Sequence, residues 1–317
     1  MASLSVLLLG GTGTIGRATA RALRAEGHRV TALIRPAADE NLLPGCSLIR
    51  GEVTDRTTLA SAMTGCDAVI SCLASRTGAP ADAWAVDHAA NSAALTAAVA
   101  AGVRHFTLLS AICVQKPQLE FQRAKLAFEA ELQAAPLDWT IVRPTAFFKS
   151  LSGQVSRVQQ GRPFLVFADG RLTACKPISD ADLGRFLALT LTDPDKRNRI
   201  LPIGGPGPAI TPLDQAAMLE RLTGHPIRIR RVPVALMHGI VALMTALGTL
   251  SPHLKAKAQL ARIGRYYATE SMLLWNPVTR SYDADATPEF GTDRLEDHYA
   301  AMLRGEVADD RGAHAMF

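Results

Sequence analysis

The sequence LLLGGTGTIGRATARAL, Leu7 to Leu23, decides the fold of this 317-residue chain. An apolar run leads into glycines at positions 10, 13 and 16, and a helical apolar pattern follows them. Glycines placed between a strand and a helix allow a tight turn, and the helix N-terminus then offers free N–H groups to a pyrophosphate. The alternative is a glycine turn without a ligand, but this position favours a dinucleotide site. The predicted contacts of this turn are Gly10, Thr12, Gly13, Thr14, Ile15 and Gly16.

The first half of the chain alternates predicted strands with predicted helices. The strands are expected at 6–9, 29–34, 47–50, 68–72, 106–110 and 139–142, and the helices at 15–25, 59–63, 82–101 and 120–133. Such alternation is typical of parallel βαβ units. We therefore predict an α/β protein, with a Rossmann doubly wound parallel sheet and a smaller C-terminal α+β substrate lobe.

The rhythm breaks after Pro144, where glycine and proline become frequent. This predicts an NADP(H)-binding Rossmann domain over 1–145, a substrate lobe over 146–304 and a frayed tail over 305–317. An exchange of elements between the first two regions is left open.

Composition excludes several functional classes. The net charge is +5 without long Lys/Arg runs, which argues against nucleic-acid binding. The five cysteines are odd in number and show no CxxC spacing, so a disulfide framework and a zinc site are not expected, and no other pattern suggests a bound metal. The first residues lack the features of a signal or transit peptide. We expect a cytoplasmic, bacterial protein.

An apolar stretch at 232–250 approaches the ~20 residues that a membrane-spanning helix needs. Pro233, His238 and Gly239 interrupt it, so we expect a buried helix of the second lobe. The alternatives are a helix that rests on a membrane surface and a helix that lines a pocket for a flat apolar ligand.

The end of the second predicted strand indicates which coenzyme is used. An NAD site carries a carboxylate about 20 residues beyond the glycine turn. This chain has Arg35 there, and a guanidinium pairs well with a phosphate, so NADPH is predicted. Arg17 is either a second phosphate contact or a solvated helix residue. Cys72, Leu73 and Ala74 end the fourth strand and should border the nicotinamide ribose.

The next strand and helix resemble the catalytic edge of short-chain dehydrogenases. Those enzymes use a serine, then a tyrosine, then a lysine four residues later, and the tyrosine protonates a carbonyl oxygen. Ser110 and Lys125 are present here, but position 121 is phenylalanine. A reductase without this acid needs a substrate that can hold negative charge after hydride transfer, such as a conjugated alkene. Lys125 is predicted to position the coenzyme; the alternative is a solvated helix lysine.

Five segments resemble the divinyl chlorophyllide a 8-vinyl reductases, which are atypical, NmrA-like short-chain dehydrogenases. The segments span 108–132, 139–155, 174–183, 201–213 and 263–273, and include AICVQKP, FQRAK and RPTAFFKSL. The resemblance implies NADPH-dependent reduction of the 8-vinyl group of a magnesium-containing divinyl (proto)chlorophyllide to ethyl, in (bacterio)chlorophyll synthesis. Plant members begin with a chloroplast transit peptide that is not seen here, which indicates a bacterial member.

The matching segments contain the remaining candidates. Phe147 and Phe148 are predicted to stack on the flat pigment, with core packing as the alternative. Lys149 and Lys176 are candidates for its propionate, with ordinary surface lysines as the alternative. The residues expected to face the nicotinamide are Arg143, Pro144 and Thr145. The predicted proton donor is Tyr267, with Tyr266 beside it.

Two other functions remain open at this stage. One is an NmrA-like regulator that senses NADP(H) without catalysis, and the other is a structural subunit of a respiratory or photosynthetic complex. No obligate protein partner is predicted, and peripheral association with a photosynthetic membrane is left open.

Overall fold

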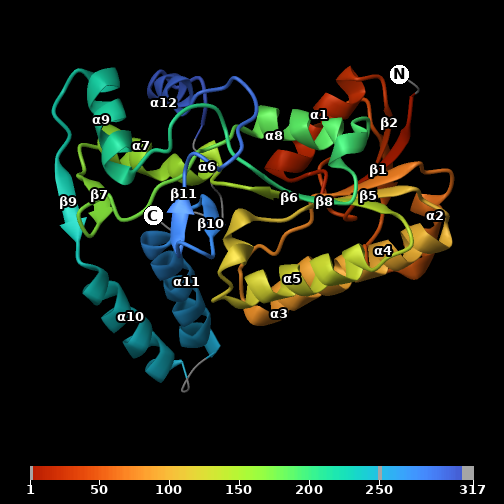
Figure 1. The fold of residues 1–317 in the computed structure, drawn as a ribbon, viewed down its shortest axis with the longest axis horizontal. Coiled ribbons are helices and arrows are strands. Elements are labelled where there is room, and N and C mark those ends of the chain that lie inside the picture. The colour runs from red at the N-terminus through yellow and green to blue at the C-terminus, as the bar shows by residue number, and fades with distance from the viewer. Residues whose placement is uncertain (1–2, 249–251, 309–317) are drawn as a thin grey trace. The chain divides into compact units, whose positions relative to one another are not determined.

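The computed structural model describes residues 3–248 and 252–308. It forms two compact units (Figure 1). The first contains Met1–Ser75, Pro80–Pro144 and Asp180–Ile203, and the second contains Arg76–Ala79, Thr145–Ser179 and Gly204–Phe317. Most of the predicted frayed tail, 309–317, lies outside the described residues.

The first unit is built on a seven-stranded parallel sheet with the order β3-β2-β1-β4-β5-β6-β8. Its strands are β1 (Ser5–Leu9), β2 (Arg29–Ile34), β3 (Ser47–Arg50), β4 (Ala68–Ser71), β5 (His105–Leu109), β6 (Asp138–Pro144) and β8 (Arg199–Ile203). The strand order reverses between β1 and β4, and dinucleotides bind at the carboxyl ends of the strands beside such a switch point. The predicted doubly wound sheet is confirmed.

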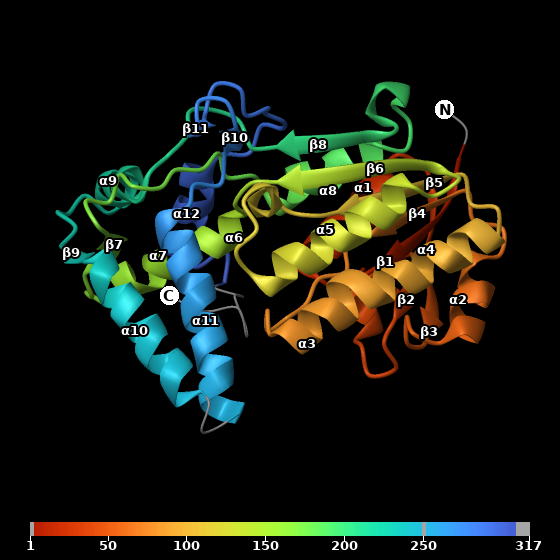
Figure 2. The same cartoon turned by 60° about the horizontal axis from the view of Figure 1, so that its bottom comes forward.

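Helices cover both faces of this sheet (Figure 2). One face carries α2 (Arg56–Met63), α4 (Asn91–Ala100) and α5 (Glu120–Gln133), and its buried core includes Met63, Phe106 and Phe128. The other face carries α1 (Thr14–Ala25) and α8 (Asp180–Leu189), with Leu23 and Ala188 in its core. Both faces are apolar, as a fully covered parallel sheet requires.

The alanine-rich helix expected at 82–101 is not regular. It consists of α3 (Pro80–Ala83), a π-helical segment (Trp84–Ala90) and then α4. Short π-helical segments often occur at functional sites. This one buries Asp87, and the adjoining first residue of α4, Asn91, is buried as well. The Ser71 hydroxyl at the end of β4 donates to the Asn91 Oδ1, at 2.6 Å.

A single boundary at residue 145 does not describe the division, because the chain returns to the first unit. β8 pairs in parallel with β6, from Thr140 opposite Arg199 to Pro144 opposite Ile203, and α8 packs on α1. Part of the predicted substrate lobe therefore completes the nucleotide-binding sheet, which is the exchange of elements that the sequence left open.

The second unit surrounds its own apolar core, which contains Phe148, Phe164, Leu219 and Tyr299. Its strands form two small sheets, β7 (Phe164–Phe167) with β9 (Ile229–Val232) and β10 (Leu274–Asn276) with β11 (Ser281–Asp283). Its helices are α6 (Phe148–Leu151), α7 (Gly153–Gln159), α9 (Pro212–Thr223), α10 (Val234–Leu247), α11 (Pro252–Thr269) and α12 (Leu295–Leu303).

Helix α10 departs from the sequence-based expectation. Of its side chains only Met237 and Val241 are buried, whereas Leu236, Ile240 and Leu243 are 54%, 38% and 56% exposed. The prediction of a buried helix is therefore wrong. Within the described residues, no helix is both long enough and apolar enough to cross a lipid bilayer.

Candidate active site

The glycine turn lies between β1 and α1, at the carboxyl edge of the sheet. Gly10 has a φ of +71°, and a Cβ built on it would lie 2.6 Å from the Cys72 carbonyl oxygen. A Cβ on Gly16 would lie 2.2 Å from the Gly10 carbonyl oxygen, so neither glycine can carry a side chain without movement. Gly13 caps α1 without a side-chain hydrogen bond. The first turn of α1 therefore presents its N–H groups without a capping side chain, which fits a pyrophosphate.

The other predicted residues of this turn divide by exposure. Ile15 is buried, whereas Thr12 and Thr14 are half-buried. The isoleucine side chain therefore anchors the start of α1, and the two threonines stay near the surface of the turn.

The end of β2 carries the predicted phosphate-binding arginine. Arg35 is exposed and, within the described part of the chain, its guanidinium has no hydrogen-bonded partner. The loop after it is held by Arg50, whose Nη1 donates to the Pro36 and Ala38 carbonyl oxygens at 2.9 and 3.1 Å. Arg50 also pairs with Glu40 at 2.8 Å. A fixed loop with an available guanidinium suits a 2′-phosphate.

The end of β4 contributes the next wall. Leu73 is half-buried and Ala74 exposed, and the Cys72 sulfur lies 3.9 Å from the Thr19 hydroxyl. Burial raises the pKa of the Cys72 thiol to about 12, with the Thr19 contact opposing the shift. The thiol therefore stays protonated at neutral pH and is not a nucleophile.

Lys125 lies on α5 and is buried. Its Nζ is 2.9 Å from Oδ1 of Asp87, which is also buried. The other carboxylate oxygen, Oδ2, is buried and has no hydrogen-bond partner among the described residues. A buried oxygen without a partner is costly, and a ribose hydroxyl would satisfy it. This geometry fits the predicted coenzyme-positioning role of Lys125 and adds Asp87 beside it.

Ser110 and Arg143 share a partner that the sequence did not reveal. Glu129 is buried; it accepts from the Ser110 hydroxyl, from Arg143 Nε at 3.2 Å and from Arg143 Nη2. The two residues were predicted to contact the coenzyme, and in the structure both donate hydrogen bonds to Glu129 of α5. Pro144 ends β6 and is buried.

The start of α5 is fixed by one side chain. Gln122 is buried, and its Oε1 accepts from the N–H groups of Gln118 and Leu119 at 2.7 and 2.8 Å. Its Nε2 donates to the Cys113 carbonyl oxygen at 2.9 Å. Phe121 precedes it on the helix and is half-buried. Because Gln122 joins α5 to the segment after β5, the position of Lys125 relative to the sheet is well defined.

Glu129 was not predicted, although helical spacing is a signal in the sequence from which it could have been found. Positions 121, 125 and 129 recur every four residues, so they lie along one face of α5. A carboxylate on the same face as a predicted site lysine is a candidate partner. Asp87 had a weaker signal, because its π-helical segment cannot be inferred from the sequence.

The predicted pigment contacts of the second unit differ in their surroundings. Phe148 is buried in the core, 5.5 Å from the His298 ring, so it is not available to stack on a ligand. Lys176 is buried and its Nζ lies 2.5 Å from Glu289, which already balances its charge. Its assignment to a propionate is not supported by this geometry. Phe147 and Lys149 are half-buried and stay candidates. Thr145 donates to the Lys176 carbonyl oxygen.

The tyrosines narrow the choice of proton donor. The chain has four of them, and the Tyr282 hydroxyl donates to Glu270 while the Tyr299 hydroxyl is bonded to Leu151 and Gln215. Tyr266 is buried, whereas Tyr267 is 41% exposed, with the ring centroids 5.7 Å apart. Tyr267 is thus the more accessible phenol of the pair.

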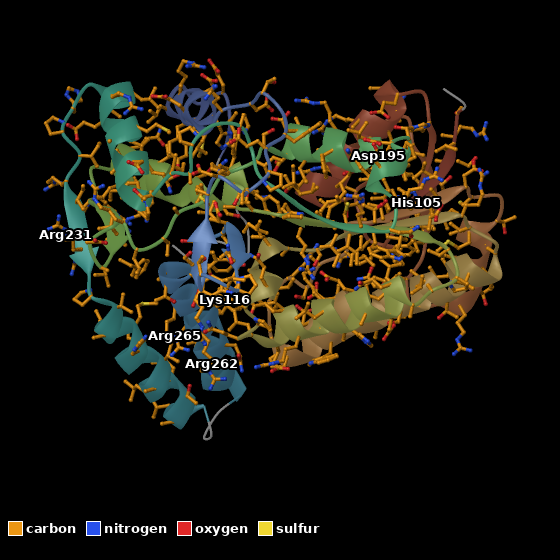
Figure 3. All side chains as sticks on the ribbon, viewed as in Figure 1. His105, Lys116, Asp195, Arg231, Arg262 and Arg265 are labelled. Atoms are coloured by element: carbon orange, nitrogen blue, oxygen red, sulfur yellow. The ribbon has the colours of Figure 1, made fainter. Side chains whose placement is uncertain are left out.

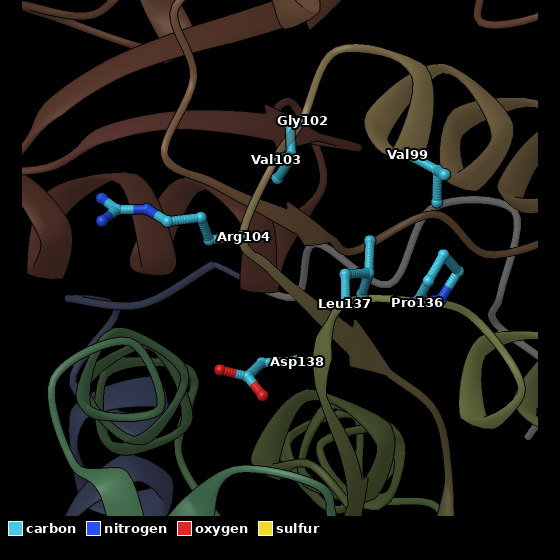
Figure 4. Close-up of a pocket in the computed structure, with 7 residues that line it drawn as sticks. All are labelled: Val99, Gly102, Val103, Arg104, Pro136, Leu137 and Asp138. Atoms are coloured by element: carbon cyan, nitrogen blue, oxygen red, sulfur yellow. The ribbon is translucent and has the colours of Figure 1, made fainter.

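A shallow pocket of about 600 Å³ lies elsewhere in the first unit (Figure 4). Its lining includes Arg104, Pro136 and Asp138, at the amino ends of β5 and β6. His105, labelled in Figure 3, begins β5 at this same end. The glycine turn and Lys125 belong to the carboxyl ends of the strands, so this pocket is not the coenzyme site.

Comparisons with known proteins agree with this geometry. A family model described as NAD(P)H-binding matches residues 10–194. The chain is 44% identical to a divinyl chlorophyllide a 8-vinyl-reductase, chloroplastic, of Oryza sativa, over 99% of this chain and 82% of the relative. It is 30% identical to the photosystem II assembly factor Ycf39 of Cyanophora paradoxa, over 74% of this chain and 73% of that protein.

The fold is similar to that of solved reductases. The structure of an NADPH-dependent quinone oxidoreductase from Escherichia coli, complexed with NADPH, superposes with a TM-score of 0.69 at 16% identity. The match covers 94% of this chain and 99% of the other.

Proposed function

The chain belongs to the divinyl chlorophyllide a 8-vinyl reductase family, and we propose that it uses NADPH to reduce the 8-vinyl group of divinyl (proto)chlorophyllide to an ethyl group. The 44% identity over 99% of the chain supports this activity. The match to the NAD(P)H-binding family, together with the exposed Arg35 guanidinium, supports the choice of NADPH.

The proposed reaction needs a hydride and a proton. NADPH, when bound, would supply the hydride, and a C–H bond would form at one vinyl carbon as the vinyl π-bond breaks. The electron pair of that bond passes into the conjugated macrocycle, and a proton then completes the ethyl group at the other carbon. Because the macrocycle spreads the negative charge, the substrate needs no acid on a carbonyl oxygen.

The protein's own residues provide binding and orientation. The first turn of α1 would offer N–H groups to the pyrophosphate, and Arg35 would offer its guanidinium to the 2′-phosphate. Lys125 would donate to the nicotinamide ribose, while Asp87 balances the charge of the lysine. Fixing the coenzyme in this way contributes to the rate because hydride transfer requires a narrow range of distance and angle.

The observation that carries the proposal is that α5 has Phe121 four residues before Lys125. The coenzyme-positioning lysine is present, and the phenol used for carbonyl reduction is replaced by a side chain that cannot donate a proton. Reduction of a conjugated C=C bond is the chemistry that tolerates this change.

An absorption assay tests the activity. The purified protein would be incubated with NADPH and divinyl chlorophyllide while the Soret band is followed. Loss of a conjugated vinyl group shifts this band slightly to the blue, and a Lys125→Met variant should slow the shift. An unshifted band under conditions where NADPH binds would contradict the proposal.

We propose pigment contacts in the second unit from the side chains that its core leaves accessible. Phe147 would stack on the macrocycle, Lys149 would pair with its propionate and Tyr267 would supply the proton. Tyr267→Phe should reduce turnover and leave the affinity for NADPH unchanged, and Tyr266→Phe is the matched control. Equal turnover in both variants would remove Tyr267 from the mechanism.

A second candidate function comes from the similarity to an assembly factor. The 30% identity to Ycf39 supports an NADP(H)-binding role in assembling a photosynthetic complex without catalysis. This function predicts tight NADPH binding with no change in the pigment spectrum, so the same assay separates the two.

We propose a reducing, cytoplasmic setting with contact at the surface of a photosynthetic membrane. None of the five cysteines, all within the described residues, forms a disulfide, which supports the reducing compartment. The exposed apolar face of α10 supports the contact with a membrane.

A further inference from the structure

Helix α10 presents an exposed face without any charged side chain. Its sequence, VALMHGIVALMTAL, contains no Asp, Glu, Lys or Arg. Leu236, Ile240 and Leu243 lie at positions i, i+4 and i+7, so they form one ridge along the helix. A helix on the surface of a globular protein normally turns charged residues toward water. This ridge is therefore suited to a surface that covers it.

The segment around α10 concentrates the positive charge of the molecule. Residues 225–269 contain seven Lys/Arg and no Asp or Glu, a net charge of +7 against +5 for the whole chain, so the remaining residues carry −2. These seven are Arg228, Arg230, Arg231, Lys255, Lys257, Arg262 and Arg265.

Six of the seven basic residues come from the two elements next to α10, and Arg228 directly precedes β9. Arg230 and Arg231 are exposed on β9, which leads directly into the helix, and Lys257 is exposed on α11, which packs along it. Figure 3 shows Arg231 on β9 and Arg262 and Arg265 on α11. The two helices lie side by side in both Figure 1 and Figure 2.

We propose that the pair α10–α11 docks on the surface of an anionic lipid bilayer. The ridge Leu236–Ile240–Leu243 would enter the boundary between headgroups and acyl chains, and the arginines and lysines would contact the anionic headgroups. An apolar helix face combined with flanking basic residues is the pattern of helices that lie in a membrane interface.

Charge favours a bilayer over two other partners for the ridge, a second copy of the chain and an acidic protein. A second copy of the chain would bring another +7 segment against the first, and like charges oppose that association. An acidic protein would satisfy the arginines, but it would also have to present an apolar groove that fits the ridge between its acidic residues. A bilayer meets both requirements.

Vesicle flotation tests the proposal without any need for enzymatic activity. The full chain, loaded with NADPH, should float with vesicles that contain about 30 mol % phosphatidylglycerol and not with vesicles of phosphatidylcholine alone. Raising the salt from about 0.05 to about 0.5 M should weaken the binding, because it screens the charges.

Two sets of variants separate the ridge from the charges. L236Q/I240Q/L243Q should lose at least about ten-fold in vesicle affinity, because it removes the apolar contribution while glutamine preserves helix formation. Its control is L172Q/V278Q, which removes two exposed apolar residues from other parts of the same unit. R230Q/R231Q/K257Q should bind anionic vesicles more weakly than the wild type, and its binding should lose its dependence on salt. The control R199Q/R221Q/R304Q removes the same number of positive charges outside residues 225–269, and it should bind the vesicles more strongly than R230Q/R231Q/K257Q.

Three results would overturn the proposal. One is the absence of flotation with anionic vesicles, and another is equal flotation of the ridge variant and its control. The third is a dimer, measured by light scattering, that the ridge variant converts to a monomer, since this would assign the ridge to self-association. An unchanged far-UV circular dichroism spectrum and an unchanged thermal unfolding midpoint show that each variant is folded, and the charge variant still tests the proposal if the ridge variant does not fold.

Discussion

At position 121 the chain has a phenyl ring, which cannot donate a proton, where short-chain dehydrogenases have a phenol. Phe121, Lys125 and Glu129 share one face of α5, and each has a distinct environment: a half-buried ring, a lysine paired with Asp87 and a carboxylate shared by Ser110 and Arg143. The sequence alone showed that position 121 lacks a phenol, and it predicted that Lys125 positions the coenzyme. It could not predict the buried partners, because these depend on contacts with the π-helical segment and with β6.

The choice of coenzyme is tested at Arg35. Arg35→Ala should weaken NADPH binding by roughly 10- to 100-fold, because a charge-assisted phosphate contact contributes about 1.5–3 kcal/mol. NADH binding should change little, since it lacks the 2′-phosphate. Fluorescence titration of both coenzymes measures this, with Arg21→Ala, an exposed arginine on α1, as the control. Equal losses for NADPH and NADH would contradict the assignment.

The buried pair Asp87–Lys125 predicts a strong coupling. Asp87→Asn should destabilise the fold by about 3 kcal/mol, because it leaves a buried ammonium without its counter-charge. Adding Lys125→Met should recover part of this loss. Urea unfolding of the two single variants and the double variant measures the coupling energy, and strictly additive effects would show that the two residues do not interact.

His105 predicts a stability that depends on pH. Burial lowers its pKa from 6.5 to about 4, so the folded protein keeps the imidazole neutral while the unfolded chain takes up a proton below about 6.5. Stability from this residue is present above pH 6.5 and is lost as the pH falls toward 4, by up to about 3 kcal/mol.

Urea midpoints at pH 7.5 and pH 5 measure this effect for the wild type and for His105→Gln. The variant keeps a polar group near the Thr140 hydroxyl, which lies 2.9 Å from His105 Nε2. Its stability should fall less on acidification than that of the wild type. Equal falls would assign the acid sensitivity to other groups.

At the scale of elements, local sequence patterns predicted whether a segment is a helix or a strand better than they predicted whether it is buried. The predicted bounds of β2, β3 and α5 are confirmed. Asp55 caps α2 by accepting hydrogen bonds from the N–H groups of Thr57 and Thr58. Helix α10 was assigned to the wrong environment, since an apolar helix has the same composition in a core and on a surface.

Helix α8 shows a constraint that only the structure reveals. A Cβ on Gly184 would lie 2.6 Å from the Ala18 carbonyl carbon, so α8 approaches the backbone of α1 closely. Gly184→Ala should destabilise the first unit by about 1–3 kcal/mol through overpacking.

Gly239 is the matched control for this prediction. It is also within a helix, but among the described residues a Cβ there meets no atom within 4 Å apart from its own helix backbone, so Gly239→Ala should be neutral or stabilise by up to about 1 kcal/mol. Urea midpoints compare the two variants. Similar midpoints would mean that α8 can move away from α1 without cost.

At the scale of the whole molecule, the glycine turn and the alternating strands were enough to predict the doubly wound sheet and its coenzyme edge. The return of the chain to this sheet through α8 and β8 was not predictable, because strand pairing between segments far apart leaves no local signal. The same limit applies to the pigment site. Its candidates came from the family resemblance, and burial then removed Phe148 and Lys176.

The most direct test of the proposed reaction follows one hydrogen atom. NADPH carrying deuterium at the transferable position of nicotinamide C4 would be turned over with divinyl chlorophyllide, and the product examined by mass spectrometry and NMR. Direct hydride transfer to the vinyl group predicts a single deuterium in the new ethyl group, with the second added hydrogen exchangeable with solvent during the reaction. An ethyl group without coenzyme-derived deuterium, or deuterium at another position of the macrocycle, would contradict it.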